Sequence, residues 1–184
     1  MKTLETERLI LRKFKQDDFD AVHSYADCAE NLIYMMWGPN TEEQTRDFIN
    51  MSIAQAEESP CVNYNYAVEL KNHGKVIGGC GIYISDDDDN KAEIGWLLHR
   101  GYWLKGYGTE IGEALLQFSF EELNLHRIVA RCDAENIGSY RVMEKIGMRR
   151  EGLFLEARPA NKLSDKKYGD ELRYAVLKRE WEVR

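Results

Sequence analysis

The sequence predicts a mixed α/β (α+β) domain with a mostly antiparallel, twisted sheet of six to seven strands and about four flanking helices. At 184 residues, 43% of them hydrophobic and 31% charged, the chain has the size and composition of one globular domain, so we assign residues 1–184 to a single domain. The hydrophobic period changes from helical to two at Asn63 and returns to helical at Thr109. Three strands therefore follow one another without an intervening helix, which favours antiparallel pairing.

The segment before Asn63 contains one strand and two helices. Alternation around branched residues predicts an opening strand at 8–14, and apolar residues at helical spacing predict a helix over 17–27. A second helix begins at Thr41, where Gln44 three residues later completes the pattern of a capping box. The connection between the helices, 31–40, is rich in aromatic residues and methionine.

The central block consists of three strands at 63–70, 75–84 and 91–99 and an amphipathic helix over 109–122. The turn before the third strand holds the acidic run Asp86–Asp89, which we expect to form a solvated hairpin tip. A calcium site is the alternative, but the spaced ligands and the fixed glycine of a calcium loop are missing.

The remaining elements are a strand at 127–132, a short helix over 139–146 that ends at Gly147, and a closing hairpin. The two strands of that hairpin fall within 151–159 and 170–181. The predicted order is therefore β-α-α-β-β-β-α-β-α-β-β.

Composition argues against several classes of protein. The formal charge of −7 argues against general affinity for nucleic acid, and the first fifteen residues contain an apolar run of only three, which predicts neither a signal peptide nor a membrane partner. We expect a cytoplasmic protein. No Cys-x-x-Cys motif occurs and the four histidines lack metal-ligand spacing, so we expect reduced thiols and no metal. The cysteines are Cys28, Cys61, Cys80 and Cys132.

The stretch GYWLKGYGTEIGEAL (101–115) is typical of a phosphate-binding loop. Gly106 and Gly108 leave backbone N–H groups uncrowded beside Lys105, at the positive end of the helix that follows. A P-loop would need lysine where Tyr107 stands, and a dinucleotide fingerprint needs another glycine spacing within a parallel βαβ unit. An anion held by backbone N–H groups is the remaining interpretation.

The segment from Lys91 to Gly152, KAEIGWLLHRGYWLKGYGTEIGEALLQFSFEELNLHRIVARCDAENIGSYRVMEKIGMRREG, resembles the acetyl-CoA-binding core of the GNAT superfamily of N-acetyltransferases. It is most similar to the branch that contains the ribosomal-protein alanine N-acetyltransferases, and the opening LETERLILRKFKQDDFDAV is similar to the start of that branch. The family's loop, [QR]-x-x-G-x-[GA], corresponds to Trp103–Gly108, where Trp103 departs from the expected Gln or Arg.

The resemblance implies a GNAT fold whose sheet is splayed between its fourth and fifth strands. It also implies acetyl-CoA as acetyl donor, with the pantetheine arm in the slot that the splay opens. The residues it assigns to the donor are Leu97, Lys105, Gly106, Tyr107, Gly108, Thr109, Asn136 and Ser139.

Two residues are candidates for proton transfer. Glu93 lies on the fourth predicted long strand and could take the proton of the amine directly or through water; an exposed structural carboxylate is the alternative. Ser139 matches the family's N-x-x-S segment near the sulfur and could protonate the leaving thiolate. Asn136 and Ser139 could equally cap the helix, and both roles are compatible. The tyrosine acid of many relatives is replaced here by Met143.

Two other groups of residues were weighed. An acetyl-cysteine intermediate on Cys132 is disfavoured, because a lone strand cysteine is usually a buried small hydrophobe. Tyr34 and Trp37, beside two methionines, form either a wall of the acceptor site or part of the core.

These observations predict an acetyl-CoA-dependent N-acetyltransferase that acts by direct transfer in a ternary complex. The acceptor is a primary amine, either a protein N-terminus or a small molecule, and a homodimer is left open. The alternative is a non-catalytic acyl-CoA sensor or interaction module with the same fold.

Overall fold

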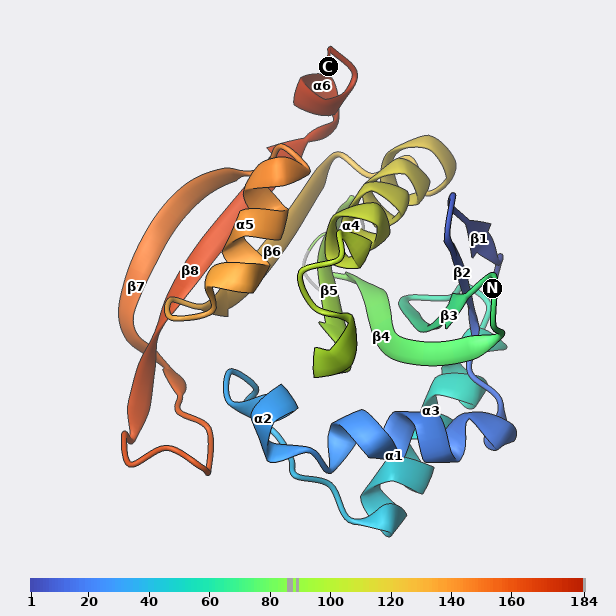
Figure 1. The fold of residues 1–184 in the computed structure, drawn as a ribbon. Coiled ribbons are helices and arrows are strands. Elements are labelled where there is room, and N and C mark those ends of the chain that lie inside the picture. Colours follow the sequence, from blue (N-terminus) through green and yellow to red (C-terminus); the bar gives the residue numbers. More distant parts are fainter. Residues whose placement is uncertain (86–87, 89, 184) are drawn as a thin grey trace.

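One twisted sheet runs through the molecule, and helices cover both of its faces (Figure 1). The computed structural model describes residues 1–85, 88 and 90–183. Within these residues the sheet has eight strands in the order β1-β2-β3-β4-β5-β6-β8-β7. All neighbouring strands pair antiparallel except β5 and β6. The mixed α/β class and the mostly antiparallel sheet are thereby confirmed.

The strands agree closely with the predicted ones, and the additional strand is the two-residue β1 that pairs with β2. Periodicity does not identify an element of two residues. The strands are β1 (Leu4–Glu5), β2 (Leu9–Lys13), β3 (Asn63–Leu70), β4 (Lys75–Ile84), β5 (Lys91–Leu98), β6 (Arg127–Asp133), β7 (Arg149–Pro159) and β8 (Tyr168–Leu177). The predicted acidic hairpin tip lies largely outside the described residues, because Asp86, Asp87 and Asp89 are not among them.

The four predicted helices are present, together with two of only four residues each, α2 and α6. The helices are α1 (Phe19–Ala26), α2 (Ala29–Leu32), α3 (Glu42–Ala56), α4 (Tyr107–Gln117), α5 (Ile137–Lys145) and α6 (Lys178–Trp181). Thr41 caps α3 and Gln44 completes the predicted capping box. A π-helical turn, Phe118–Glu122, extends α4.

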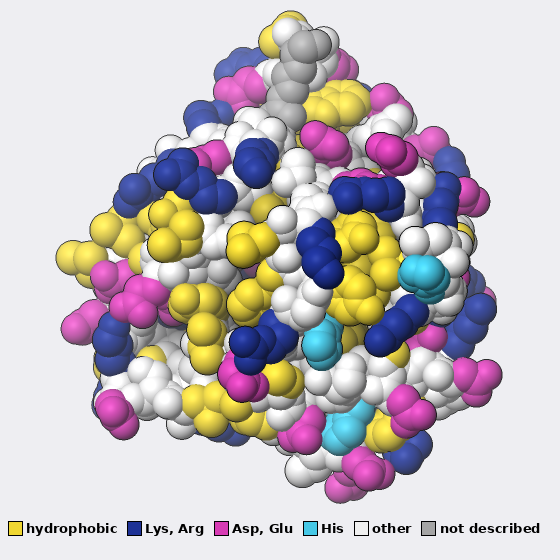
Figure 2. Space-filling model, viewed as in Figure 1, with side chains coloured by type: hydrophobic (Ala, Val, Ile, Leu, Met, Phe, Trp, Pro, Cys, Tyr) yellow, Lys and Arg dark blue, Asp and Glu magenta, His cyan; other side chains and the backbone are white. Residues whose placement is uncertain are grey.

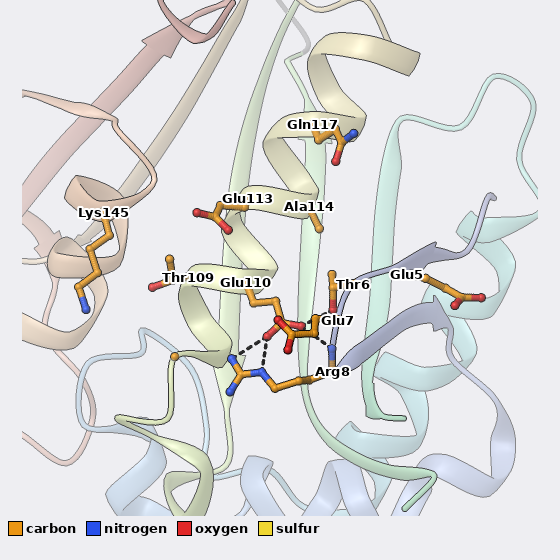
Figure 3. Close-up of a pocket in the computed structure, with 11 residues that line it drawn as sticks. Glu5, Thr6, Glu7, Arg8, Thr109, Glu110, Glu113, Ala114, Gln117 and Lys145 are labelled. Atoms are coloured by element: carbon orange, nitrogen blue, oxygen red, sulfur yellow. Dashed lines mark hydrogen bonds and ion pairs between the residues drawn. The ribbon is translucent and has the colours of Figure 1, made fainter. Parts of the chain in front are cut away.

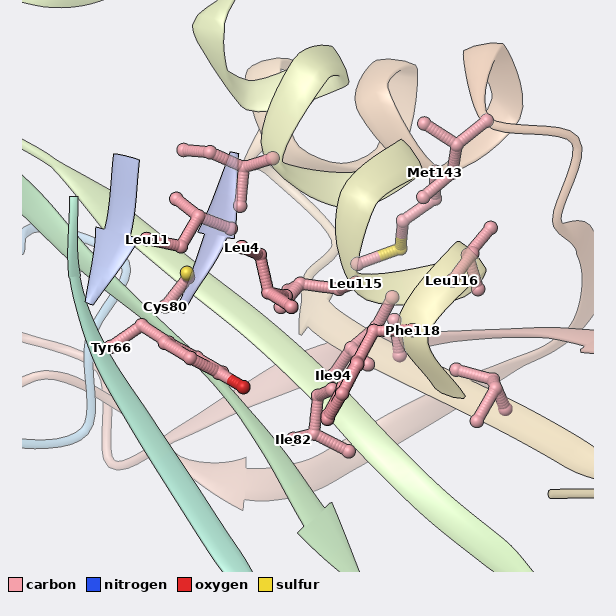
Figure 4. Close-up of a cluster of buried hydrophobic side chains, with 14 of the residues drawn as sticks. Leu4, Leu11, Tyr66, Cys80, Ile82, Ile94, Leu115, Leu116, Phe118 and Met143 are labelled. Carbon is pink, nitrogen blue, oxygen red and sulfur yellow. The ribbon is translucent and has the colours of Figure 1, made fainter. Parts of the chain in front are cut away.

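The larger hydrophobic core lies between the sheet and the pair of helices α4 and α5, which pack side by side (Figures 1 and 4). Leu115 and Leu116 of α4 and Met143 of α5 are fully buried there against Ile94 of β5. Burying such side chains contributes about 1.5–3 kcal/mol each. This core fixes α4 and α5 over the junction of β5 and β6.

A second core lies on the opposite face of the sheet, under α1 and α3. In β3, Tyr66 and Val68 belong to the first core whereas Ala67 between them belongs to the second, as the two-residue period of a strand requires. In β5, Leu97 packs on the second core and Leu98 on the first. The two hydrophobic cores therefore lie on opposite faces of the sheet.

The predicted splay is present between β5 and β6, the fourth and fifth long strands. Their parallel ladder consists of Lys91 with Arg127, Ala92 with Ile128, and Glu93 with Val129. Beyond Glu93, β5 continues to Leu98 without pairing to β6. The two strands therefore present unpaired backbone edges to each other, with α4 and α5 above them.

Candidate active site

The start of α4 has the geometry of an anion site. Gly106 stands at the N-cap with φ of +83°, a left-handed conformation that glycine adopts without a steric penalty. No side chain caps the helix, and the first N–H groups of an α-helix have no partner within the helix itself. These N–H groups and the helix dipole together favour a negatively charged ligand.

Arg8 holds this loop from outside and was not predicted as a site residue. Its guanidinium donates to the carbonyl of Lys105 at 3.0 Å and lies 4.5 Å from the centre of the Tyr107 ring. It also pairs with Glu110 on α4, with Nε to Oε2 at 2.7 Å (Figure 3). A single side chain thereby joins the turn before β2 to both sides of Gly106.

Glu110 completes this connection. Its carboxylate accepts hydrogen bonds from the Thr6 hydroxyl and from the backbone N–H of Arg8, the latter at 2.8 Å. Burial opposes ionisation, but the hydrogen bonds from Thr6 and Arg8 outweigh it and lower the pKa of Glu110. Arg8 and Glu110 line a cavity of about 540 Å³ beside α4, together with Thr109 and Lys145.

Gly108 also has a packing role between two helices, in addition to the backbone role that its place in the motif predicts. A Cβ added there would lie 3.1 Å from Cγ2 of Val142 on α5, so the missing side chain allows α4 and α5 to approach closely. Gly108 therefore sets the spacing of the two helices, and its backbone remains in the first turn of α4.

The other loop residues point in several directions. The Lys105 ammonium donates back to the carbonyl of Gly101 at 2.8 Å, and the Trp103 indole donates to the carbonyl of Leu98 at 2.7 Å. Trp103 thus anchors the loop to the end of β5, in the position where the family pattern has Gln or Arg. On this face of the molecule, Lys and Arg side chains gather near the centre of the view, in spite of the net charge of −7 (Figure 2).

Asn136 and Ser139 lie at the start of α5, where β6 has diverged from β5. The Asn136 side chain accepts from the N–H of Ser139 at 3.0 Å, so the expected helix cap is present. Burial raises the pKa of the Cys132 thiol to about 11, against the lowering influence of the nearby Ser139 side chain, so the thiol is protonated at neutral pH. Such a thiol is a poor nucleophile.

Glu93 lies at the vertex of the splay, on the face of the sheet opposite Ser139. Its neighbours in β5, Ala92 and Ile94, belong to the first core, so the Glu93 side chain points away from α4 and α5. Oε1 of Glu93 accepts from Nε of Arg131 at 2.8 Å, an ion pair that spans from β5 to β6. Oε2 is therefore the oxygen left for a further partner.

A cavity of about 340 Å³ opens beside this ion pair. Arginines, two carboxylates and two aromatic residues are prominent in its lining: Arg127, Arg131, Arg173, Glu93, Glu151, Phe154 and Tyr174. It lies on the face of β6 and β8 that α5 does not cover. The cavity therefore adjoins the slot from the side opposite the glycine loop 101–108.

Trp37 is exposed and Tyr34 is half-buried, so neither belongs to the buried core that the alternative interpretation expected. Met36 is 48% and Trp37 42% exposed, and the buried residues of the connection 31–40 are Asn31 and Leu32. Buried Arg158 donates to the carbonyl of Tyr34 at 2.8 Å and pairs with Asp133 at the end of β6. The segment is thus attached to the β7–β8 end of the sheet, next to the splayed strands.

Sequence reasoning missed the arginines of the site: Arg8, Arg131, Arg158 and Arg173. Alternation within β6 could have placed Arg131 on the face of Glu93, but only the pairing register of two separate strands brings the two side chains together.

Within the described part of the chain, no group of three or more His, Cys, Asp or Glu residues could hold a metal ion. No helix there has the length and apolar character needed to cross a membrane.

Comparison with known proteins gives the class to which this fold and site belong. The family model of the GNAT acetyltransferase domain matches residues 8–149. The chain therefore belongs to the GNAT acetyltransferase family, whose members use acetyl-CoA to acetylate amines.

Individual relatives agree with this assignment. The chain is 37% identical to the uncharacterized N-acetyltransferase YnaD of Bacillus subtilis over 97% of this chain and 98% of that protein. A crystal structure of a GNAT-family acetyltransferase from Bacillus anthracis superposes with a TM-score of 0.85 at 37% identity, covering 97% and 100% of the two chains. The ribosomal-protein-S5-alanine acetyltransferase of Vibrio fischeri shares the fold, with a TM-score of 0.82 at 19% identity and coverage of 98% and 99%.

Proposed function

We propose that the protein transfers an acetyl group from acetyl-CoA directly to a primary amine within a ternary complex. The observation that carries this proposal is that the residues proposed to bind the donor and the residue proposed as the base lie on opposite faces of one splayed sheet. The anion site at Gly106 and the Asn136–Ser139 turn belong to the α4 and α5 face, whereas Glu93 points to the other. Donor and acceptor could then meet through the gap between β5 and β6.

The residues on the donor side hold acetyl-CoA in this proposal. The N–H groups of Tyr107, Gly108 and Thr109 would face the pyrophosphate, with Lys105 nearby. Leu97 lies on β5 beyond Glu93, where no residue of β6 pairs with the strand, so this edge is available to the pantetheine arm. Tyr34 and Trp37 would border the acceptor, because their segment is attached to the end of β6 through Arg158.

The chemistry requires three events. The amine nitrogen attacks the thioester carbonyl, its surplus proton passes to Oε2 of Glu93 directly or through a water, and the C–S bond breaks. The thiolate leaves and takes a proton, for which the Ser139 hydroxyl is the candidate donor. No acyl-cysteine is needed, and the raised pKa of Cys132 disfavours one.

The test is release of CoA thiol from acetyl-CoA with a panel of amines, for wild type and Glu93→Gln. Glutamine keeps an oxygen that can accept from Arg131, so local structure should survive while the base is removed. We expect turnover to fall by about 10² or more, with acetyl-CoA affinity changed less than about twofold. Glu43→Gln, an exposed change on α3, is the control and should leave both quantities unchanged.

Two outcomes would contradict the proposal. A near-normal rate of Glu93→Gln at every pH would return Glu93 to a structural role. Tight binding of acetyl-CoA by the wild type, with no thiol release above background for any amine, would favour the acyl-CoA sensor.

A further inference from the structure

Two arginines stand directly opposite each other on neighbouring strands beside Glu93. The antiparallel register of β6 and β8 pairs Arg131 with Arg173, and both side chains line the 340 Å³ cavity. Like charges at directly opposed positions of a sheet destabilise it. Each arginine side chain is about half exposed, at 49% for Arg131 and 48% for Arg173, so neither is withdrawn into the core.

Each of these arginines is fixed by one nitrogen only. Arg131 donates from Nε to Glu93 at 2.8 Å, and Arg173 donates from Nε to Glu171 at 2.7 Å. Glu171 is buried, with 4% exposed, and Phe154 lies 4.1 Å below the Arg173 guanidinium. Side-chain orientation is therefore set, while the terminal amino groups of both arginines have no hydrogen-bond partner among the described residues.

The other arginine of the cavity behaves differently. Arg127 uses both terminal amino groups on the two oxygens of Glu151, which is the saturated, bidentate arrangement of a structural ion pair. Arg158, close by, also has both terminal groups occupied, by Asp133 and the carbonyl of Tyr34. Of the four arginines Arg127, Arg131, Arg158 and Arg173, only the opposed pair Arg131 and Arg173 leaves its terminal amino groups without a partner among the described residues.

We propose that the acceptor carries a carboxylate next to its amine, and that the terminal amino groups of Arg131 and Arg173 bind this carboxylate. This inference rests on the proposed acetyl transfer. The planar guanidinium fork matches a carboxylate, and an anion between two opposed cations removes their repulsion. Because Arg131 touches Glu93 directly, a carboxylate held there leaves the amine within a few ångströms of Oε2 of Glu93. The acceptor class is a short amino-carboxylate such as an α-amino acid.

The same cavity is poorly suited to the other acceptor classes. A polyamine would need several open carboxylates, but both oxygens of Glu151 are paired with Arg127, and Glu93 offers only Oε2 beside its pair with Arg131. The N-terminus of a protein presents a neutral amide where an amino acid presents its carboxylate, and would leave the two guanidiniums unneutralised. A volume of about 340 Å³ lies at the small-molecule end of ligand cavities.

The test compares each α-amino acid with its own carboxamide, which differs only at the carboxyl group. Binding is measured by calorimetry on the protein saturated with CoA, and turnover by thiol release from acetyl-CoA. We expect binding and kcat/KM to favour the amino acid by about ten- to a hundredfold for at least one side chain. The carboxamide has the less basic and therefore more often neutral amine, so intrinsic reactivity opposes this preference. Spermidine and a short peptide with a free N-terminus represent the other classes.

Variants connect the preference to the two arginines. Arg131→Gln and Arg173→Lys should each lower the preference for the acid in binding about tenfold, with the affinity for acetyl-CoA little affected. The effect on turnover is measured with Arg173→Lys, because Arg131 also pairs with the proposed base Glu93. Lysine keeps the charge beside buried Glu171, so Arg173→Lys tests the fork without leaving an unpaired carboxylate. Arg150→Gln, the same charge change on exposed β7 outside the cavity, should leave the preference intact.

The outcomes separate this inference from the proposed function. Acids that bind no better than their carboxamides overturn the carboxylate site, and turnover of spermidine or the peptide in their place leaves the acetyl transfer standing. Acids that bind through Arg131 and Arg173 without any thiol release support the carboxylate site and overturn the transferase.

Discussion

At the residue scale, Arg8 contacts the loop 101–108 on both sides of Gly106, although the sequence did not single it out. It touches the carbonyl of Lys105, the ring of Tyr107 and the carboxylate of Glu110, and a Cβ added to Gly106 would lie 3.3 Å from its terminal nitrogen. These contacts hold the loop on both sides of its left-handed residue. We therefore regard Arg8 as a positioning residue for the donor.

Arg8→Gln should lower acetyl-CoA affinity about three- to tenfold, since one or two charge-assisted hydrogen bonds that are partly exposed to solvent are lost. Turnover at saturating donor should change little, because Glu93 and the acceptor cavity are on the other face. Calorimetry with acetyl-CoA and steady-state kinetics measure the two effects separately.

The control for Arg8 is Lys2→Gln, which removes an exposed ion pair with Glu122 in the same N-terminal segment but away from the loop. Equal loss of affinity in both variants, or a loss of turnover without a loss of affinity in Arg8→Gln, would contradict the positioning role.

The residues of the site differ in how far the sequence could predict them. The place of Gly106 in the loop before a helix was predictable from the glycine spacing, but its left-handed conformation at the N-cap was not, because N-cap residues are usually extended. The partnership of Glu93 and Arg131 was not predictable, because it depends on where the ladder of β5 and β6 ends. The close approach of Gly108 to Val142 could not be predicted either, because it depends on how α4 packs against α5.

At the scale of elements, Glu110 connects the β1–β2 turn to α4. Its folded-state pKa is lowered, so its contribution to stability is fully present above the ordinary value of 4.5 and is lost as the pH falls through the lowered pKa. Below that range the carboxyl is protonated and can no longer accept charge-assisted bonds from Arg8.

Glu110→Gln should therefore lower the free energy of unfolding by about 1–2 kcal/mol at pH 7, and the difference from wild type should persist to about pH 4.5 and vanish below it. Urea unfolding across this pH range measures the difference. Glu113→Gln, an exposed position one turn further along α4, should show no such dependence, and a difference for Glu110→Gln that grows on acidification would contradict the assignment.

Elements were predicted well where they were long. The strands β3 and β4 have the bounds that their periodicity gives, and Thr41 begins α3 as its capping pattern indicates. The helices α2 and α6 span only four residues each, and one turn carries no period to detect. The π-helical turn after α4 is likewise set by packing, with Phe118 and Phe120 both buried.

At the scale of the whole molecule, the sheet and its main core connect both halves of the chain. The core joins Ile94 of β5, Leu115 of α4, Ile128 of β6 and Val176 of β8. A contiguous core of this kind supports the proposal that residues 1–184 act as one domain.

Unfolding by urea should then be a single cooperative transition. Far-ultraviolet circular dichroism and tryptophan fluorescence should give the same midpoint, because the four tryptophans are spread over the chain, at Trp37, Trp96, Trp103 and Trp181. Saturating acetyl-CoA should move both midpoints together to higher urea. Two different midpoints would show that the chain contains units that unfold independently, and would contradict the single domain.

The short ladder between β5 and β6 also bears on the order in which the chain folds. Strands β3, β4 and β5 meet through short turns, whereas β5 reaches β6 only across α4 and its π-helical extension. Closing a longer loop costs more conformational entropy, so local strand pairs form before distant ones. The three residue pairs that end at Glu93 and Val129 are then among the last contacts to form. Substitutions there should mainly speed unfolding and leave the folding rate nearly unchanged, so the slot between the two strands is completed after most of the native structure is already in place.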